Sequence, residues 1–198
     1  LDHGYQVYSS DIENFLQLKN KNFKNSDMNL PLPYQSDYLE AVVCIDGIEH
    51  LENQFSFVRE TNRILKKDGI VIISTPNISS IRSRIRWFLT GHHHKCKLPL
   101  EESNPNPLHH IGMISFHKMR YILHSNNYQI LQTRTNRIKW INWIYMIFFP
   151  LIWFNTWWVY RREKNPQQRR YNQQILKQMM SISMLCGETM IIAAKKVN

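Results

Sequence analysis

Two apolar runs of strand length, separated by one amphipathic helix, constrain this chain more than any other feature. The first run is Leu39–Ile45 and the second is Ile70–Ser74. Between them, apolar residues recur near the helical period, which predicts a helix over about 53–66. We expect Gly69 to end this helix in the left-handed conformation. A mostly apolar strand followed by a helix and a second such strand predicts parallel pairing and a sheet covered on both faces.

Further segments extend this pattern in both directions along the chain. Tyr5–Ser9 resembles a short strand that ends near an acid, and Ser115 is suited to cap a helix that Ser125–Asn127 would end. Near the end, Tyr128–Thr135 and Glu188–Lys196 should pair as an antiparallel hairpin at the sheet edge. The sequence therefore predicts an α/β chain with a mostly parallel sheet, flanking helices and an antiparallel C-terminal strand.

Length and cysteine content narrow the class of protein. The chain has 198 residues, 43% of them hydrophobic, which suits one globular domain with a sizeable core. Its three cysteines are scattered and odd in number, and they form no CxxC pair. This pattern favours a reducing compartment and a cytoplasmic location over a disulfide framework.

The charge of the chain is strongly uneven. The formal net charge is +10, yet residues 1–60 hold ten acidic and four basic side chains. Residues 134–170 hold eight basic side chains and a single acid, Glu163. Because these basic residues surround an aromatic stretch, an anionic membrane surface is favoured at least as strongly as nucleic acid. We see no strong nucleic-acid signal.

The aromatic stretch Trp140–Tyr160 has 21 residues without a charge. That length would permit a transmembrane helix. However, the strands on either side should pair in one hairpin, so the chain must return to the same side. Pro150, at the centre, would break a helix. We expect an insertion over about 138–165 with two short helices that lie on the inner face of a membrane. An apolar cap over an acceptor pocket and a dimer interface are the alternatives.

Polar groups follow the predicted strands where ligands bind in parallel sheets. Asp11 and the cluster from Asp46 to His50 both fall at carboxyl ends of strands. Residues 91–112 form a long polar stretch, which is typical of a lid loop. The run His92-His93-His94 lies in it, and we interpret this run as part of a solvated loop and not as a metal site.

The stretch Asp27–Asn77 resembles the middle of class I S-adenosylmethionine-dependent methyltransferases. The resemblance is strongest to the group that includes ubiquinone-type O-methyltransferases and enzymes that tailor bacterial surface glycans. It rests on a Leu-Pro loop, the acid Asp46 at a strand end, an Ile-Glu-His-Leu step and a strand that ends in Ser-Thr-Pro-Asn. It implies a Rossmann-like fold and methyl transfer from S-adenosylmethionine to a hydroxyl of a small-molecule, glycan or lipid-linked acceptor. The alternative is a catalytically inactive methyltransferase-like module that binds a membrane or a partner.

The resembled family has a glycine-rich loop after its first strand, and this chain contains no GxGxG. The second strand of that family would begin only a few residues after Leu1. We therefore expect residues 1–198 to form a single methyltransferase-like domain that is truncated at its N-terminus, with the first strand missing.

The resemblance also assigns cofactor contacts to strand ends. An acid after the second strand would accept the ribose hydroxyls, and an acid with a neighbouring methionine would meet the adenine. Residues at the end of the fourth strand would lie near the methionine part of the cofactor. In this sequence these residues are Asp11, Ile12, Asp27, Met28, Cys44, Ile45 and Asp46.

Glu49 and His50 are the candidate catalytic residues, and three interpretations stay open. In the first, the pair begins a helix, where the dipole favours a carboxylate. In the second, His50 is a general base that takes a proton from an acceptor hydroxyl. In the third, the pair binds a metal together with Asp46, as a similar pattern does in small-RNA 2′-O-methyltransferases, which need a further histidine downstream. No loop histidine lies at a diagnostic spacing, so we predict no metal site.

Overall fold

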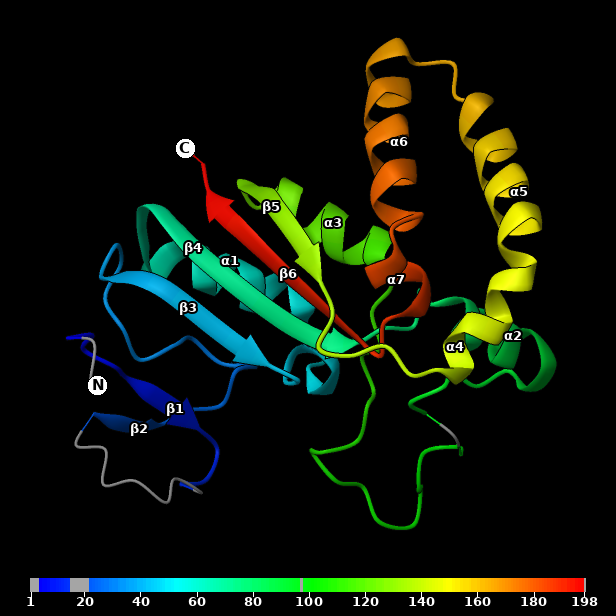
Figure 1. The fold of residues 1–198 in the computed structure, drawn as a ribbon. Helices are drawn as coiled ribbons and strands as arrows, with labels where there is room; N and C mark the ends of the chain where they lie inside the picture. The colour runs from blue at the N-terminus through cyan, green and yellow to red at the C-terminus, as the bar shows by residue number, and fades with distance from the viewer. Residues whose placement is uncertain (1–3, 15–21, 97, 198) are drawn as a thin grey trace.

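A four-stranded sheet in the order β3-β4-β6-β5 forms the centre of the computed structural model, which describes residues 4–14, 22–96 and 98–197 (Figure 1). Strand β3 pairs with β4 in parallel, and β6 runs antiparallel to both β4 and β5. β3, β4 and β5 therefore share one direction, and the predicted α/β fold with an antiparallel C-terminal strand is confirmed. The strands are β3 Leu39–Ile45, β4 Leu65–Pro76, β5 Tyr128–Arg134 and β6 Thr189–Lys196.

The connection from β3 to β4 differs from the prediction at one end. Helix α1 covers Gln54–Ile64, and β4 begins directly at Leu65. The left-handed residue of this region is Asp68, with φ of 64°, so the prediction for Gly69 was wrong. Gly69 is needed for space, because a Cβ there would lie 2.8 Å from the carbonyl oxygen of Lys66.

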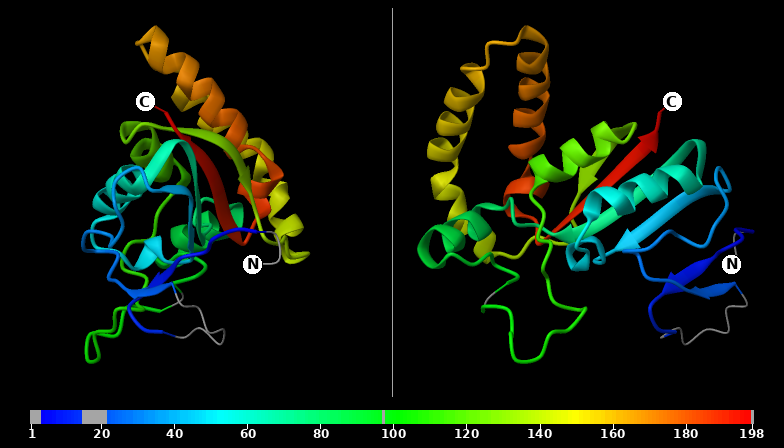
Figure 2. Two further views of the ribbon diagram at one scale, coloured as in Figure 1. Left: turned by 90° about the vertical axis from the view of Figure 1, so that its left-hand side faces the viewer. Right: turned by 180° about the vertical axis from the view of Figure 1, so that it is seen from behind.

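Two helices pack on the same face of the sheet, α1 and α3 (Phe116–Ser125), as Figures 1 and 2 show. Ser115 caps α3 as predicted, since its side chain accepts a hydrogen bond from the Lys118 N–H. The Tyr128 hydroxyl lies 3.0 Å from Thr61 Oγ1 and ties β5 to α1. The core between these layers includes Ile48, Val58, Ile64, Ile73, Phe116, Met119, Ile122 and Met190.

The other face of the sheet is open at β3. Val43 is 58% exposed and Ile45 is 74% exposed, so the expectation that this strand is covered on both faces was wrong. The reason is that α1 and α3 lie on one face only. In addition, β4 is the only described strand that pairs with β3.

A second, two-stranded parallel sheet consists of β1 (Ser9–Asp11) and β2 (Phe23–Asn25). The strand predicted over Tyr5–Ser9 therefore begins only at its last residue. A 2.6 Å hydrogen bond between the hydroxyls of Tyr8 and Tyr38 attaches this pair to the start of β3. No described strand pairs with both sheets, and the absence of the fold's first strand from this chain stays a prediction.

The aromatic insertion folds into helices that project beyond the sheet (Figures 1 and 2). Pro150 lies in the first turn of α5, where a missing N–H costs no hydrogen bond, and the chain returns through α6, as predicted. Within the described ranges, no helix is both long enough and apolar enough to cross a membrane. The helices are α2 Ile81–Thr90, α4 Ile141–Ile144, α5 Phe149–Arg161, α6 Pro166–Met179 and α7 Ile182–Cys186, with the short 3-10 helix η2 at Tyr145–Phe148.

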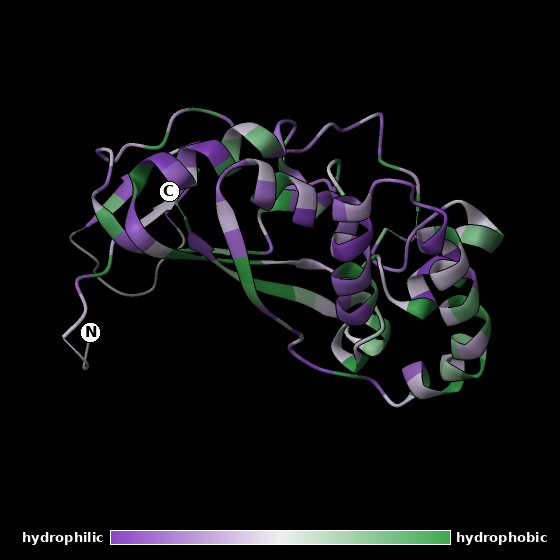
Figure 3. Ribbon diagram, turned by 90° about the horizontal axis from the view of Figure 1, so that it is seen from above, coloured by the Kyte–Doolittle hydropathy of each residue, from purple (hydrophilic) through white to green (hydrophobic). Residues whose placement is uncertain are grey.

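A small second core holds this insertion to the rest of the molecule. Ile81, Leu185 and Cys186 are fully buried there, and Phe149 and Ile152 pack against them. Figure 3 shows hydrophobic residues gathered along the central strands and also along the projecting helices. Part of the apolar surface of the insertion therefore has no covering within the described chain.

Candidate functional site

Asp11 and Asp27 lie at the same edge of the small sheet. Asp11 pairs opposite Asn25, and Asp27 follows Asn25 by two residues. The Ser26 N–H donates to the Asp11 carbonyl oxygen at 2.9 Å, which holds the two strand ends together. The Asp11 carboxylate accepts a 2.7 Å hydrogen bond from the N–H of Ile12, and all of this edge is exposed or half-buried.

The loop after β2 meets the loop after β3. Asp27 Oδ1 accepts hydrogen bonds from the backbone and side-chain nitrogens of Asn29 at 2.8 and 3.1 Å, an Asx turn that fixes this loop. Met28 packs against the main core. A Cβ on Gly47 would lie 3.0 Å from Met28 Cε and 3.2 Å from Cys44 Sγ, so a larger residue would require these side chains to shift by a few tenths of an ångström.

Asp46 is the polar group that the end of β3 presents. Its φ is 45°, a conformation that few residues other than glycine adopt. Ser74 on β4 stabilises it, because the Asp46 N–H donates to the Ser74 carbonyl at 3.1 Å and the Ser74 hydroxyl donates to Asp46 Oδ1 at 2.8 Å. By contrast, Cys44 belongs to the core, where burial raises the pKa of its thiol to about 12. Ile45 lies on the open face.

Glu49 is buried, which the sequence did not indicate. It lies in the short 3-10 helix η1 (Ile48–His50), ahead of α1, whose N-cap is Asn53. The interpretation as the start of the long helix was therefore wrong. Glu49 is 1% exposed, and neither carboxylate oxygen has a hydrogen-bond partner among the described residues. Burial raises the pKa of this carboxyl group.

His50 lies beside Glu49 and faces a histidine from the loop. Its Nδ1 is 3.1 Å from the carbonyl oxygen of His109. A carbonyl can only accept, so Nδ1 carries the hydrogen and Nε2 of the neutral ring is left as an acceptor. The ring of His110 lies 4.8 Å from that of His50, and burial lowers the pKa of His110. One ligand atom each from Glu49, His50 and His110 lies within 4.8 Å of the others.

The end of the 91–112 loop is fastened to η1. The Gly112 N–H donates to the Glu49 carbonyl at 2.8 Å, and the Gln54 side chain donates to the carbonyls of Ile48 and Gly112. A Cβ on Gly112 would lie only 2.7 Å from the Leu51 carbonyl oxygen. Sequence reasoning missed Gln54 and Gly112, and it did not distinguish His110 from the other histidines of the loop. The lid role of this loop remains a prediction.

One buried acid lies close to four basic side chains near the start of the 91–112 loop. Glu188 is 4% exposed, and within 4.0 Å of its carboxylate lie nitrogens of Arg82, His94, Lys95 and Lys139. His93 stacks on Trp87 and lies 3.2 Å from Ser83 Oγ. His92, His93 and His94 are all half-buried, so the expectation of a solvated run was wrong.

The chain is similar to known methyltransferases in part of its sequence and in its fold. Residues 1–73 match the sequence profile of a family described as "Methyltransferase domain". The crystal structure of a SAM dependent methyltransferase from Archaeoglobus fulgidus superposes with a TM-score of 0.53 at 17% identity, over 98% of this chain and 78% of that chain. The protein has the fold of the class I S-adenosylmethionine-dependent methyltransferases. S-adenosylmethionine is the cofactor that this methyltransferase fold and the family match imply.

Two sequence relatives of this chain come from Mycobacterium tuberculosis, strains CDC 1551 / Oshkosh and H37Rv. Both carry the name "Probable S-adenosylmethionine-dependent methyltransferase", and both are 48% identical over 48 residues. The matched stretch covers 24% of this chain and 17% of each relative. The chain thus matches less than a fifth of the length of these relatives.

The residues at the strand ends of the methyltransferase fold suit its cofactor. Asp11 and Asp27 provide exposed or half-buried carboxylates at one edge, and Gly47 leaves the backbone there without a side chain. Asp46 adds a third carboxylate, fixed by Ser74. Carboxylates accept hydrogen bonds from ribose hydroxyls and from an adenine amino group.

Proposed function

We propose that this protein transfers a methyl group from S-adenosylmethionine to a hydroxyl of a lipid-linked or glycan acceptor. The observation that carries the proposal is the convergence of strand ends. The loops after β2 and β3 meet where Met28 approaches Gly47, and Asp11 lies on the strand beside β2. The family match over residues 1–73 covers all of these elements.

Each strand end has a distinct role in this proposal. Asp11, with Ile12 beside it, accepts the ribose hydroxyls, and Asp27 accepts the adenine amino group with Met28 beside the ring. Asp46 lies toward the methionine part, while Cys44 and Ile45 contribute shape alone. When bound, S-adenosylmethionine supplies an electrophilic methyl group on sulfur, so alignment of the acceptor is the main task of the protein.

In this proposal, His50 acts as the general base. Its Nε2 is unprotonated when Nδ1 donates to the His109 carbonyl. The acceptor hydroxyl would give its proton to Nε2 when its oxygen takes the methyl group that bound S-adenosylmethionine would supply. Glu49, beside His50 and buried, would stabilise the resulting imidazolium in its carboxylate form.

Titration calorimetry with S-adenosylmethionine tests the cofactor site. Asp11→Asn keeps the size of the side chain but removes its charge, and we expect affinity to fall about tenfold, the effect of losing one charge-assisted hydrogen bond. Asp68→Asn, at an exposed position near the start of β4, is the matched control and should leave affinity unchanged. No binding to the unchanged protein would instead favour the catalytically inactive module.

A second candidate is methyl transfer assisted by a divalent ion. It is favoured by the buried, unpartnered carboxylate of Glu49 beside the nitrogens of His50 and His110. Activity should then disappear with a chelator and return with Mn²⁺ or Mg²⁺, and His110→Ala should weaken that return while His92→Ala should not. Activity that is indifferent to the chelator would leave His50 as a base alone.

The partner in this proposal is an anionic membrane surface that the insertion contacts. We define the aromatic surface as the exposed apolar residues Trp143, Ile147, Leu151, Phe154 and Trp158. Arg161 and Arg162 lie over the rings of Trp157 and Trp158, at 5.1 and 5.2 Å from the ring centroids. Aromatic rings beside basic groups are typical of proteins that bind lipid headgroups.

A further inference from the structure

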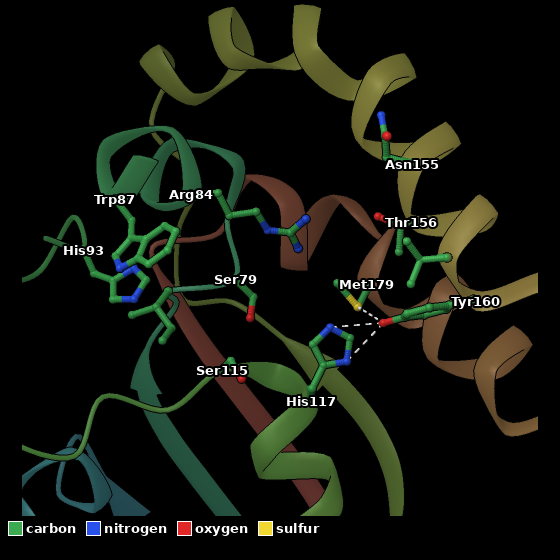
Figure 4. Close-up of a pocket in the computed structure, with 12 residues that line it drawn as sticks. Ser79, Arg84, Trp87, His93, Ser115, His117, Asn155, Thr156, Tyr160 and Met179 are labelled. Atoms are coloured by element: carbon green, nitrogen blue, oxygen red, sulfur yellow. Dashed lines mark hydrogen bonds between the residues drawn. The ribbon is translucent and has the colours of Figure 1, made fainter. Parts of the chain in front are cut away.

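A cavity of about 620 Å³ lies beyond the end of β4, between α2, α3, α5 and the end of α6 (Figure 4). Apolar side chains form much of its wall, among them Ile78, Trp87, Val159 and Met179. Ser115, which also lines it, follows Gly112 by three residues. Since Gly112 contacts Glu49, the cavity and the strand-end site share one stretch of loop.

Arg84 extends from α2 into this cavity, toward His117 and Tyr160 (Figure 4). Its guanidinium has no side-chain hydrogen bond or ion pair with any described residue, and no acid is among the residues that line the cavity. Burial lowers the pKa of Arg84. Arg84 is half-buried, and a cation that lies beside largely apolar side chains without a counter-ion is poorly solvated, so an anionic ligand would stabilise it.

The other polar groups around the cavity carry no charge, and most of them already make hydrogen bonds within the protein. The Tyr160 hydroxyl lies 3.1 Å from His117 Nε2 and 3.3 Å from Met179 Sδ. Burial lowers the pKa of His117, so its ring is neutral at pH 7. Ser79 Oγ accepts from the Phe116 N–H at 2.9 Å. Arg84 is therefore the one charged group at the cavity wall, within the described residues, that is left to bind a ligand.

We propose that this cavity binds an amphiphile with a single anionic group, a carboxylate or a phosphate ester. Arg84 pairs with the anion through its forked N–H donors, and the apolar body lies along Trp87, Val159 and Met179. Binding of the amphiphile does not depend on the proposed function. Only its role as the methyl acceptor rests on that function. Helix α5 contributes both to the cavity and to the aromatic surface, which suits a ligand that leaves a membrane.

Titration calorimetry with decyl phosphate and decanoate, below their micelle concentrations, tests this binding directly. Methyl phosphate lacks the apolar chain, and decyl glucoside lacks the charge. Arg84→Gln should weaken binding of the anionic amphiphiles roughly 10- to 100-fold, the range for a lost charged hydrogen bond. Arg59→Gln, which removes an exposed arginine on α1, is the control and should change nothing.

A second variant tests the apolar part without touching the charge. Val159→Trp fills the cavity from α5. It should weaken the binding of decyl phosphate and leave the affinity for methyl phosphate unchanged. Equal affinity of Arg84→Gln and the unchanged protein would overturn the proposal, as would equal affinity for methyl and decyl phosphate. S-adenosylmethionine binding is measured in the same samples. If it persists when amphiphile binding fails, only this inference is lost, and the reverse result contradicts only the proposed function.

Discussion

Gly112 shows how closely a single residue fixes the loop at the functional site. A Cβ there would lie 2.7 Å from the Leu51 carbonyl and 3.3 Å from the Glu49 carbonyl, and backbone atoms cannot move aside cheaply. We expect Gly112→Ala to lower the free energy of unfolding by about 1–3 kcal/mol, as overpacking does. Urea denaturation measures this. Gly91→Asn is the control, because nothing lies within 4 Å of a Cβ at Gly91 and asparagine tolerates its φ of 71°. Equal stability of the two variants would contradict the prediction.

At the residue scale, the sequence predicts positions better than contacts. Asp46 was found because a strand-length apolar run ends there, and Asp11 because it follows a short strand. No such signal identified Ser74, Gln54 or Gly112. Ser74 contacts Asp46, and Gln54 contacts Gly112, and each of these partners is distant along the chain. Burial of Glu49 was likewise unpredictable, since it depends on the loop that covers η1.

Among the elements, the junction of α2, the loop and β6 depends on Glu188. Replacing it with glutamine would leave Arg82, Lys95 and Lys139 close together without their counter-ion. We expect Glu188→Gln to destabilise the protein by about 2–3 kcal/mol, somewhat less than a fully buried pair because the cations are partly exposed. Glu163→Gln, at a half-buried position after α5, keeps the side-chain oxygen that accepts from the Asn165 N–H and should have little effect in the same thermal unfolding experiment.

The same group predicts a pH dependence. Burial alone would raise the pKa of Glu188, but hydrogen bonds from Lys139 and Asn142 and the nearby cations lower it overall from 4.5. A carboxyl group whose pKa is lower in the folded state stabilises the protein above its ordinary pKa, and this contribution is lost as the pH falls through the folded value. Unfolding measured between pH 6 and pH 3 should show this loss, and Glu188→Gln should remove it. If the unfolding free energy of the variant depended on pH as steeply as that of the unchanged protein, Glu188 would not be the group responsible.

Periodicity predicted the elements well but placed their junctions poorly. The apolar runs located β3 and β4, yet α1 ends at Ile64 and not near Lys66. The turn chemistry was hidden because Asp68, and not the neighbouring glycine, takes the left-handed conformation. The open face of β3 was also missed, since an apolar run does not reveal how many layers cover it.

For the whole molecule, the aromatic surface predicts binding to anionic vesicles. The paired change Phe154→Ser and Trp158→Ser removes two large exposed apolar groups and should weaken binding to vesicles with phosphatidylglycerol at least about tenfold. Tyr171→Ser, on the exposed side of α6, is the control in the same sedimentation assay. Salt should weaken binding by the unchanged protein, because exposed charges are screened. If the paired change instead abolishes self-association and leaves vesicle binding intact, the surface is a dimer interface.

The position of β6 determines when this sheet can form during synthesis. Thr189–Lys196 lies between β4 and β5 and supplies the hydrogen bonds that join them. Until those residues emerge from the ribosome, β4 and β5 have no shared partner, although each has long been translated. One edge of β4 and one edge of β5 therefore stay without their common partner while more than fifty intervening residues are made, and unpaired strand edges favour aggregation during such an interval.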